Sequence, residues 1–108
     1  MSGDLGDLGA FAEPSLLILA SLAGGAKHGY AIMEDVEAIG GRGLGPGTLY
    51  AALARLEARG LIEALPPQDR RRPYRLTGVG ATALRAQLEG LEGFTRTALR
   101  RLEGPVGS

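Results

Sequence analysis

Apolar residues recur every three to four positions along four stretches of the sequence, and each stretch is bounded by glycine or proline. This spacing places apolar side chains on one face of an α-helix, so each stretch predicts a helix. The predicted helices cover residues 14–23, about 28–38, 46–59 and about 78–102. The first is apolar on nearly every side, which indicates a short helix buried at the centre of the fold. The inward-facing residues expected on the second and third are Ile32, Val36, Ile39, Leu49, Leu53 and Leu56.

The pattern changes between the third and fourth predicted helices. Residues 61–65 and 74–77 are short β-compatible runs, and they flank the loop sequence PPQDRRRP. Proline at both ends of a loop suits edge strands and stops a ladder from extending. This stretch therefore predicts a β-hairpin with a basic tip. Thr77 follows the hairpin and is expected to cap the last helix.

Three helices, a two-stranded hairpin and a long helix follow one another in the order of a winged helix-turn-helix with one C-terminal helix. The expected fold class is therefore mainly α with a small β-hairpin. A chain of 108 residues is too short for two independent cores. The expected organisation is a loose N-terminal leader over 1–13, a winged helix DNA-binding domain over 14–78, a C-terminal dimerisation helix over 79–103 and a tail over 104–108.

Composition excludes several classes of function. The sequence has no cysteine, which excludes disulfides and cysteine-ligated zinc or iron–sulfur sites. Its single histidine argues against a histidine-built metal site and a Ser–His–Asp triad, so we expect neither an enzyme nor a cofactor. The sequence shows no signal peptide, and its longest apolar run, residues 16–23, is too short to span a membrane. We therefore expect a cytoplasmic protein with no membrane partner.

The formal net charge of zero hides an asymmetry along the chain. Residues 1–41 contain six acids and one lysine, whereas residues 42–101 contain eleven arginines and five acids. Arginine is suited to bidentate contacts with phosphate and guanine. The basic part of the chain contains the third predicted helix and the hairpin tip, so the distribution keeps nucleic acid open as a partner.

Several short motifs occur in a fixed order along the chain. They are HGYAI at 28–32, GPGTLYAAL at 45–53, RLE at 55–57, GLI at 60–62, RRRPYRLT at 70–77 and then Gly80. Together they resemble the signature of PadR-type transcriptional regulators over roughly residues 14–80. The single helix after them resembles the short subfamily, whose members dimerise through that helix. Two departures are Gly45, where the family often has a capping residue, and the absence of tryptophan in the last helix.

The third predicted helix is the expected recognition helix of the helix-turn-helix. The residues expected on its outward face are Thr48, Ala51, Ala52, Arg55 and Arg59. Small residues with arginine suit a helix pressed into the major groove. We expect Arg59 to be exposed to solvent without contacting DNA. Tyr30 either packs against the protein or contacts DNA. The three consecutive arginines at 70–72 either contact the DNA backbone or form a solubilising loop. The residues expected to contact DNA are Lys27, Tyr30, Pro46, Gly47, Thr48, Tyr50, Arg55, Arg70, Arg71 and Arg72.

Apolar and small residues in the last helix follow alternating steps of three and four, which is typical of a coiled-coil seam. The helix could fold back on its own core, but the seam runs farther than a small three-helix core can cover. We therefore expect a homodimer. The expected interface residues are Leu84, Leu88, Leu91, Phe94, Thr95, Ala98 and Leu102.

These patterns predict a sequence-specific regulator that binds double-stranded DNA at a pseudo-palindromic operator as a homodimer. We expect a repressor, because a dimer bound at a promoter blocks access of the polymerase. The resemblance implies that the repressor responds to a ligand. Thr95 and Ala98 are small and leave room in the seam for a small apolar or aromatic effector, unless packing closes the gap. The alternative is a winged-helix protein–protein interaction module that does not bind DNA, which the neutral net charge and the acidic first third favour.

Overall fold

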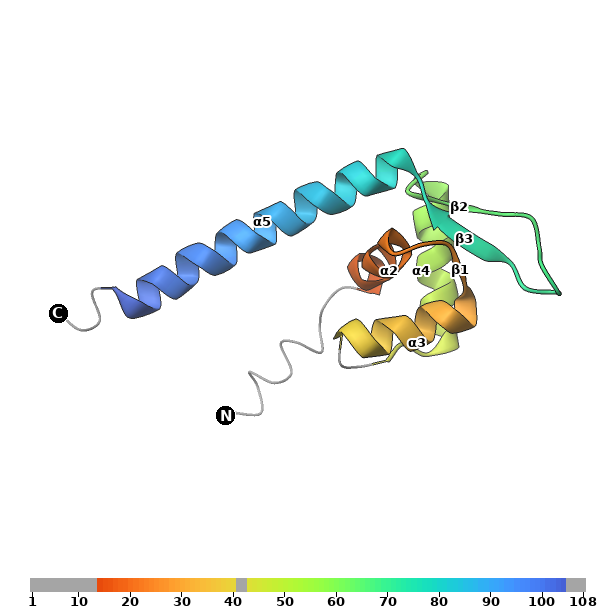
Figure 1. Cartoon of the computed structure of the whole chain (residues 1–108), viewed down its shortest axis with the longest axis horizontal. Helices are drawn as coiled ribbons and strands as arrows, with labels where there is room; N and C mark the ends of the chain where they lie inside the picture. The colour runs from red at the N-terminus through yellow and green to blue at the C-terminus, as the bar shows by residue number, and fades with distance from the viewer. Residues whose placement is uncertain (1–13, 41–42, 105–108) are drawn as a thin grey trace.

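The structure is a computed structural model that describes residues 14–40 and 43–104, and Figure 1 shows its elements. Its elements in chain order are α2 (Pro14–Ala23), β1 (Lys27–His28), α3 (Gly29–Gly40), α4 (Pro46–Ala58), β2 (Ile62–Ala64), β3 (Pro73–Leu76) and α5 (Gly78–Glu103). The expected winged helix-turn-helix with one long C-terminal helix is confirmed. The expected leader over 1–13 and tail residues 105–108 lie outside the described residues.

Helix α2 lies at the centre of the core and packs against α3, α4, α5 and β3. Its apolar sequence leaves no polar face, so it is stable only when surrounded by other elements. The core that it nucleates is wholly aliphatic, as the scarcity of aromatic residues requires. The buried apolar residues are Ile18, Leu19, Leu22, Ile32, Val36, Leu49, Ala52, Leu53, Leu56, Ile62 and Leu84.

Two residues lie on the opposite side from the one that the helical spacing predicts. Ile39 is 52% exposed, so its expected place on the buried stripe of α3 is wrong. It lies in the last turn of α3. Ala52 is fully buried, so its expected place on the outward stripe of α4 is also wrong. Leu49, Leu53 and Leu56 are buried as predicted, and Ala52 widens their face.

The sheet has three strands in the order β1-β3-β2, with both pairs antiparallel, rather than the two expected. Lys27 pairs with Tyr74 and His28 with Pro73, so β1 adds an edge strand to the hairpin. The expected second helix therefore begins at Gly29 instead of His28. A strand of two residues shows no alternation, and only its pairing with a distant strand reveals it.

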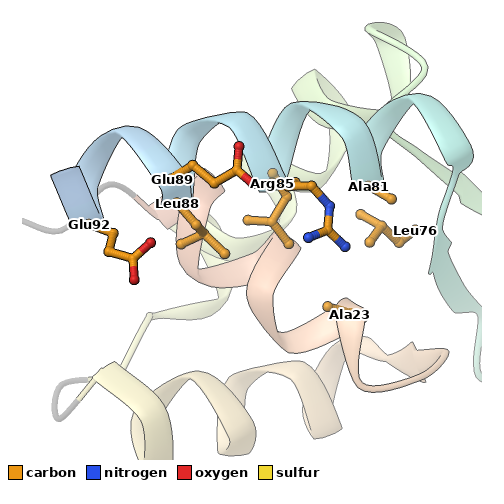
Figure 2. A pocket seen from close by; sticks show the side chains of 8 residues that line it. Ala23, Leu76, Ala81, Arg85, Leu88, Glu89 and Glu92 are labelled. Carbon is orange, nitrogen blue, oxygen red and sulfur yellow. The ribbon is translucent and has the colours of Figure 1, made fainter.

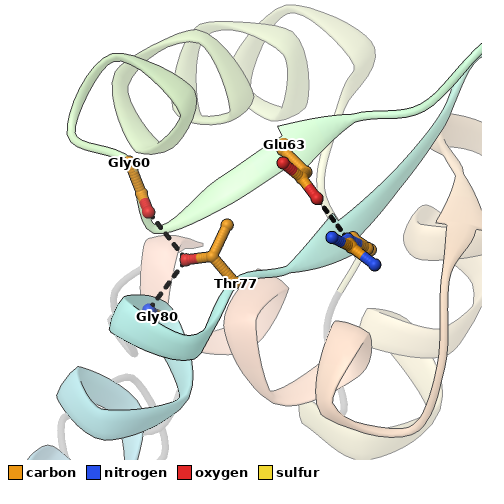
Figure 3. Close-up of polar contacts among 5 residues, drawn as sticks. Gly60, Glu63, Thr77 and Gly80 are labelled. Carbon is orange, nitrogen blue, oxygen red and sulfur yellow. Dashed lines mark hydrogen bonds and ion pairs between the residues drawn. The ribbon is translucent and has the colours of Figure 1, made fainter.

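Thr77 connects the sheet to α5. Its hydroxyl donates to the carbonyl oxygen of Gly60 at 2.7 Å and accepts the backbone N–H of Gly80 at 3.0 Å, as Figure 3 shows. The predicted N-terminal cap is therefore confirmed. A Cβ on Gly80 would collide with the backbone carbonyl of Leu61, so this position requires glycine. These contacts fix the direction in which α5 leaves the domain.

Helix α5 runs for 26 residues without a break, although it contains Gly90 and Gly93. It leaves the winged domain on the side opposite to the hairpin loop, as Figure 1 shows. The Cα radius of gyration is 16.5 Å, against roughly 13 Å for a compact chain of this length. Within the part of the chain that the structure describes, no helix combines the length and apolar character needed to cross a membrane.

Candidate nucleic-acid interface

The exposed face of α4 carries several of the residues that the sequence analysis predicts to contact DNA. Thr48, Tyr50, Ala51 and Arg55 are all exposed on α4. Pro46 and Gly47 form its exposed first turn. The capping residue Gly45 has no side chain to bond the first N–H groups, which leaves them open to an acceptor from outside. The face therefore combines free donors with side chains small enough for close approach.

The loop between β2 and β3 ends in a tight two-residue turn. Gln68 and Arg71 exchange backbone hydrogen bonds of 2.6 and 2.7 Å, which leaves Asp69 and Arg70 at the tip. Their φ angles are +48° and +68°, a left-handed conformation that hairpin turns usually give to Asn and Gly. This turn presents Arg70 to solvent, and Arg71 and Arg72 follow it directly. We call residues 65–73 the wing loop.

A hollow of about 300 Å³ lies where the wing loop meets the start of α3 and the exposed face of α4. Gly29 lets the ring of Tyr50 lie directly against the first residue of α3, because a Cβ there would collide with the ring. Among the described residues, those lining the hollow include no carboxylate. They are His28, Gly29, Tyr30, Tyr50, Arg70, Arg71, Arg72 and Tyr74.

Tyr74 lies in β3 at the back of this hollow. Burial raises the pKa of its phenol, and the neighbouring Glu57 and Tyr50 raise that pKa further, against a smaller lowering by Arg72. Raising a phenol's pKa favours the neutral form. The Tyr74 hydroxyl therefore remains protonated near neutral pH and can donate a hydrogen bond.

Lys27 is not among the residues that line this hollow, although it pairs with Tyr74 in the sheet. Its ammonium donates to the carbonyl oxygens of Ser21 at 2.5 Å and Gly25 at 3.3 Å, and it lies 3.8 Å from a carboxylate oxygen of Asp35. A cation on the last carbonyls of a helix compensates their partial negative charge. These contacts place the Lys27 ammonium at the end of α2, and its phosphate contact stays a prediction.

Sequence reasoning missed His28. Its ring lies 3.1 Å from Arg71 and lines the hollow, beside the exposed Tyr30. The one available signal was its position in the HGYAI motif, next to Tyr30. Periodicity could not show that β1 brings this residue under the wing loop.

The residues of α5 that we expect at the dimer interface differ in their exposure. Leu84 is 5% exposed and belongs to the chain's own core, whereas Leu88 and Leu91 are partly open. Phe94 and Leu102 are 70% and 69% exposed, which is unusual for large apolar side chains. Thr95 is exposed and Ala98 half-buried on the same half of the helix. The distal half of α5 therefore carries large apolar side chains that are exposed in a single chain.

The sheet, the three packed helices and the basic loop together define a winged helix-turn-helix. The sequence matches the transcriptional regulator PadR-like family over residues 18–86, so the chain belongs to this family. Its members are transcriptional regulators rather than enzymes, in agreement with the sequence. Residues 14–40 and 43–104 contain no cluster of three His, Asp or Glu side chains that could hold a metal ion.

Three relatives illustrate the range of this similarity. The chain is 37% identical over 87 residues to the transcriptional regulator Rv3488 of Mycobacterium tuberculosis, covering 78% of this chain and 80% of that protein. It is 43% identical over 79 residues to an uncharacterized 37.1 kDa protein in transposon TN4556 of Streptomyces fradiae, covering 73% of this chain but 23% of that protein. A PadR family transcriptional regulator from Eggerthella lenta has a similar structure, with a TM-score of 0.76, 25% identity and coverage of 95% and 92%.

Proposed function

We propose that this regulator binds double-stranded DNA, with α4 in the major groove and the wing loop on the sugar–phosphate backbone. The observation that carries the proposal is the convergence of α4, the start of α3 and three arginines around one hollow whose described lining residues include no acid. Nucleic-acid sites combine positive charge with donors that reach phosphate oxygens.

The arginines of this face keep their charges available. Within the described residues, the ion pairs involve Lys27, Arg75 and Arg96, and none includes Arg55 or an arginine of residues 70–72. Arg55 points outward from α4, where it can reach the edge of a guanine. Thr48 and Ala51 lie on the same exposed face and permit a close fit to the groove. The proposed DNA contacts are Tyr30, Pro46, Gly47, Thr48, Tyr50, Arg55, Arg70, Arg71 and Arg72.

We propose further that two chains associate through α5. In this arrangement residues 14–78 form the DNA-binding domain and residues 79–103 the dimerisation helix. Recognition helices in such dimers lie about 34–36 Å apart, one turn of DNA. A twofold dimer therefore requires a pseudo-palindromic operator, and a dimer seated on a promoter represses transcription by blocking access.

A second hollow supports a response to a small ligand. It measures about 610 Å³ and lies between the end of α2 and the first half of α5, as Figure 2 shows. Its lining is mostly apolar, from Ala23 and Leu76 to Leu88, with Arg85 and two glutamates on the α5 side. This volume suits a small organic molecule. The residues that line this hollow do not include Thr95 or Ala98, where the sequence predicted room for an effector. A small apolar or aromatic effector bound in the hollow would alter the angle of α5, and hence the separation of the two α4 helices in the dimer.

Selection of bound duplexes from a random DNA pool, followed by sequencing, tests the function. We expect a palindromic consensus, because a twofold dimer reads two equal half-sites. Affinity for the selected duplex should fall steeply with salt as counterions are released from DNA. A protein that enriches no sequence and shows no salt dependence would instead be a protein–protein interaction module.

A further inference from the structure

The imidazole of His28 lies between two N–H donors that come from different elements. Its Nδ1 accepts the backbone N–H of Ala31 at 3.4 Å, so the ring caps the first turn of α3. Its Nε2 lies 3.1 Å from Nη1 of Arg71 in the wing loop. A neutral imidazole has one acceptor nitrogen, and a guanidinium has none. The ring therefore cannot accept a hydrogen bond from both neighbours.

The two donors differ in their freedom to move. The N–H of Ala31 is held in place by α3, whereas the exposed guanidinium of Arg71 can rotate about its flexible side chain. The immobile donor keeps the lone pair on Nδ1, which places the ring proton on Nε2. The Nε2–H of His28 and the Nη1–H of Arg71 then lie side by side as two donors. An oxygen with more than one lone pair can accept from both.

The surroundings of this pair favour an anion on one side only. His28 and Arg71 line both the 300 Å³ hollow and a neighbouring hollow of about 380 Å³. Asp69 also lines the 380 Å³ hollow, where its carboxylate repels anions. The first hollow holds the phenol of Tyr50 and the other arginines of the wing loop, with no carboxylate among its described lining residues.

We propose that His28 and Arg71 together bind one non-bridging oxygen of a phosphodiester group, which occupies the 300 Å³ hollow beside Tyr50. This site rests on the DNA binding proposed above and adds an imidazole N–H donor to it. Because His28 leads into α3 while Arg71 belongs to the wing loop, one phosphate would fix the loop against the helices. A free inorganic phosphate offers the same oxygen chemistry, so the test must separate the two sources.

Two substitutions of His28 test the capping of α3 by Nδ1 separately from the proposed phosphate contact of Nε2. Asparagine places an amide oxygen near the position of Nδ1, whereas glutamine places an N–H donor near the position of Nε2. We expect His28→Asn to keep the melting temperature and to weaken binding of the selected duplex about tenfold, as loss of a hydrogen bond to a charged group does. His28→Gln should bind within about threefold of the original protein. Equal affinity of His28→Asn and the original protein would overturn the proposal.

A double-mutant cycle tests whether the two side chains share one phosphate. We expect Arg71→Ala to weaken binding and to reduce the salt slope by about one unit. Adding His28→Asn to Arg71→Ala should then weaken binding by less than about twofold, because the shared contact is already lost. Arg70→Ala is the matched control. The binding free energy that it loses should add in full to the binding free energy lost by His28→Asn. Full additivity with Arg71→Ala as well would overturn the shared site.

Nitrogen-15 spectra of the imidazole distinguish binding of a DNA phosphodiester from binding of free inorganic phosphate. His28 is the single histidine of the sequence, so its ring signals need no assignment. We expect the Nε2–H tautomer, and an Nε2 shift with duplex DNA that millimolar inorganic phosphate at equal ionic strength does not produce. The Nδ1–H tautomer would overturn the proposal. If the protein binds no DNA at all, the proposed function fails separately. An Nε2 shift with inorganic phosphate would then support a free-anion site, and no shift would overturn the donor pair.

Discussion

Single residues at the tip of the wing loop adopt backbone conformations that glycine would adopt at lower cost. Asp69 tolerates the left-handed region because its short polar side chain can bond locally, but Arg70 has no such compensation. Strained conformations of this kind tend to persist where a side chain is needed for function. Under the proposed function, the strain at Arg70 is tolerated because its guanidinium contacts DNA.

We predict that Arg70→Gly stabilises the folded chain while weakening DNA binding. Relief of the left-handed strain should raise the free energy of unfolding by about 1 kcal/mol, equal to a rise of roughly 4–8 °C in melting temperature. Thermal unfolding followed by circular dichroism measures the gain. Arg72→Gly is the matched control, because Arg72 is not among the residues with positive φ. Equal or lower stability of Arg70→Gly than of the original protein would contradict this account.

The pKa of Tyr74 predicts a loss of stability at alkaline pH. The folded-state pKa is raised above the ordinary value of 10.0, so folding favours the neutral phenol. The corresponding stabilisation is complete below about pH 10 and is lost as pH rises through the raised folded value. Tyr74→Phe should therefore flatten the fall in unfolding free energy above about pH 10, as measured by urea titrations. Tyr30→Phe serves as control, and an equal flattening there would contradict the assignment to Tyr74.

Residue-level errors of the sequence analysis share one physical origin. Helical spacing places a residue on a face but does not say how far the neighbouring elements reach. Ala52 is buried beside the leucine stripe of α4, while Ile39 is exposed although its spacing places it in line with Ile32 and Val36. His28 was missed because its importance depends on Arg71, 43 residues away.

Helices long enough to repeat the spacing of their apolar residues could be predicted from the sequence, whereas the shortest strand could not. The stripes of α3, α4 and α5, with the Thr77 cap, gave bounds within one or two residues of the structure. The hairpin followed from its prolines and apolar runs. Strand β1 has two residues, and its existence depends on backbone pairing with β3 rather than on any local pattern. The hollow beneath the wing loop could not be predicted for the same reason.

Two glycines of α5 should respond to alanine in opposite directions. Gly80→Ala places a methyl group against the carbonyl of Leu61, so the helix must move away from the sheet. We expect a loss of at least about 2 kcal/mol in unfolding free energy, in the range of overpacked core sites. Gly90 has open space around its Cα, so Gly90→Ala should gain up to about 1 kcal/mol from helix propensity alone. Chemical denaturation of both variants measures the contrast. A stable Gly80→Ala variant would refute the close approach of α5 to the sheet.

At the scale of the whole molecule, the chain separates its basic and apolar surfaces. The wing loop lies at one end and the uncovered part of α5 at the other, as Figure 1 shows. Several large apolar side chains in the distal half of α5 are more than half exposed, including Phe94, Leu99 and Leu102. Exposed apolar patches of this kind mark association surfaces. The proposed association through this surface would leave both proposed DNA-binding faces free, as a palindromic operator requires.

Phe94→Asp tests this arrangement without disturbing the fold of one chain, because the ring is 70% exposed in it. A charge buried in an apolar interface is costly, so we expect a shift from dimer to monomer in sedimentation velocity. The monomer contacts one half-site only, so affinity for the palindromic operator should fall at least tenfold. Binding to a single half-site should change little, since residue 94 lies outside the proposed DNA face. Ala86→Asp, at an exposed position of α5 off the expected interface, is the control and should remain dimeric. A Phe94→Asp protein that stays dimeric and binds the operator normally would place the dimer interface elsewhere than on the distal half of α5.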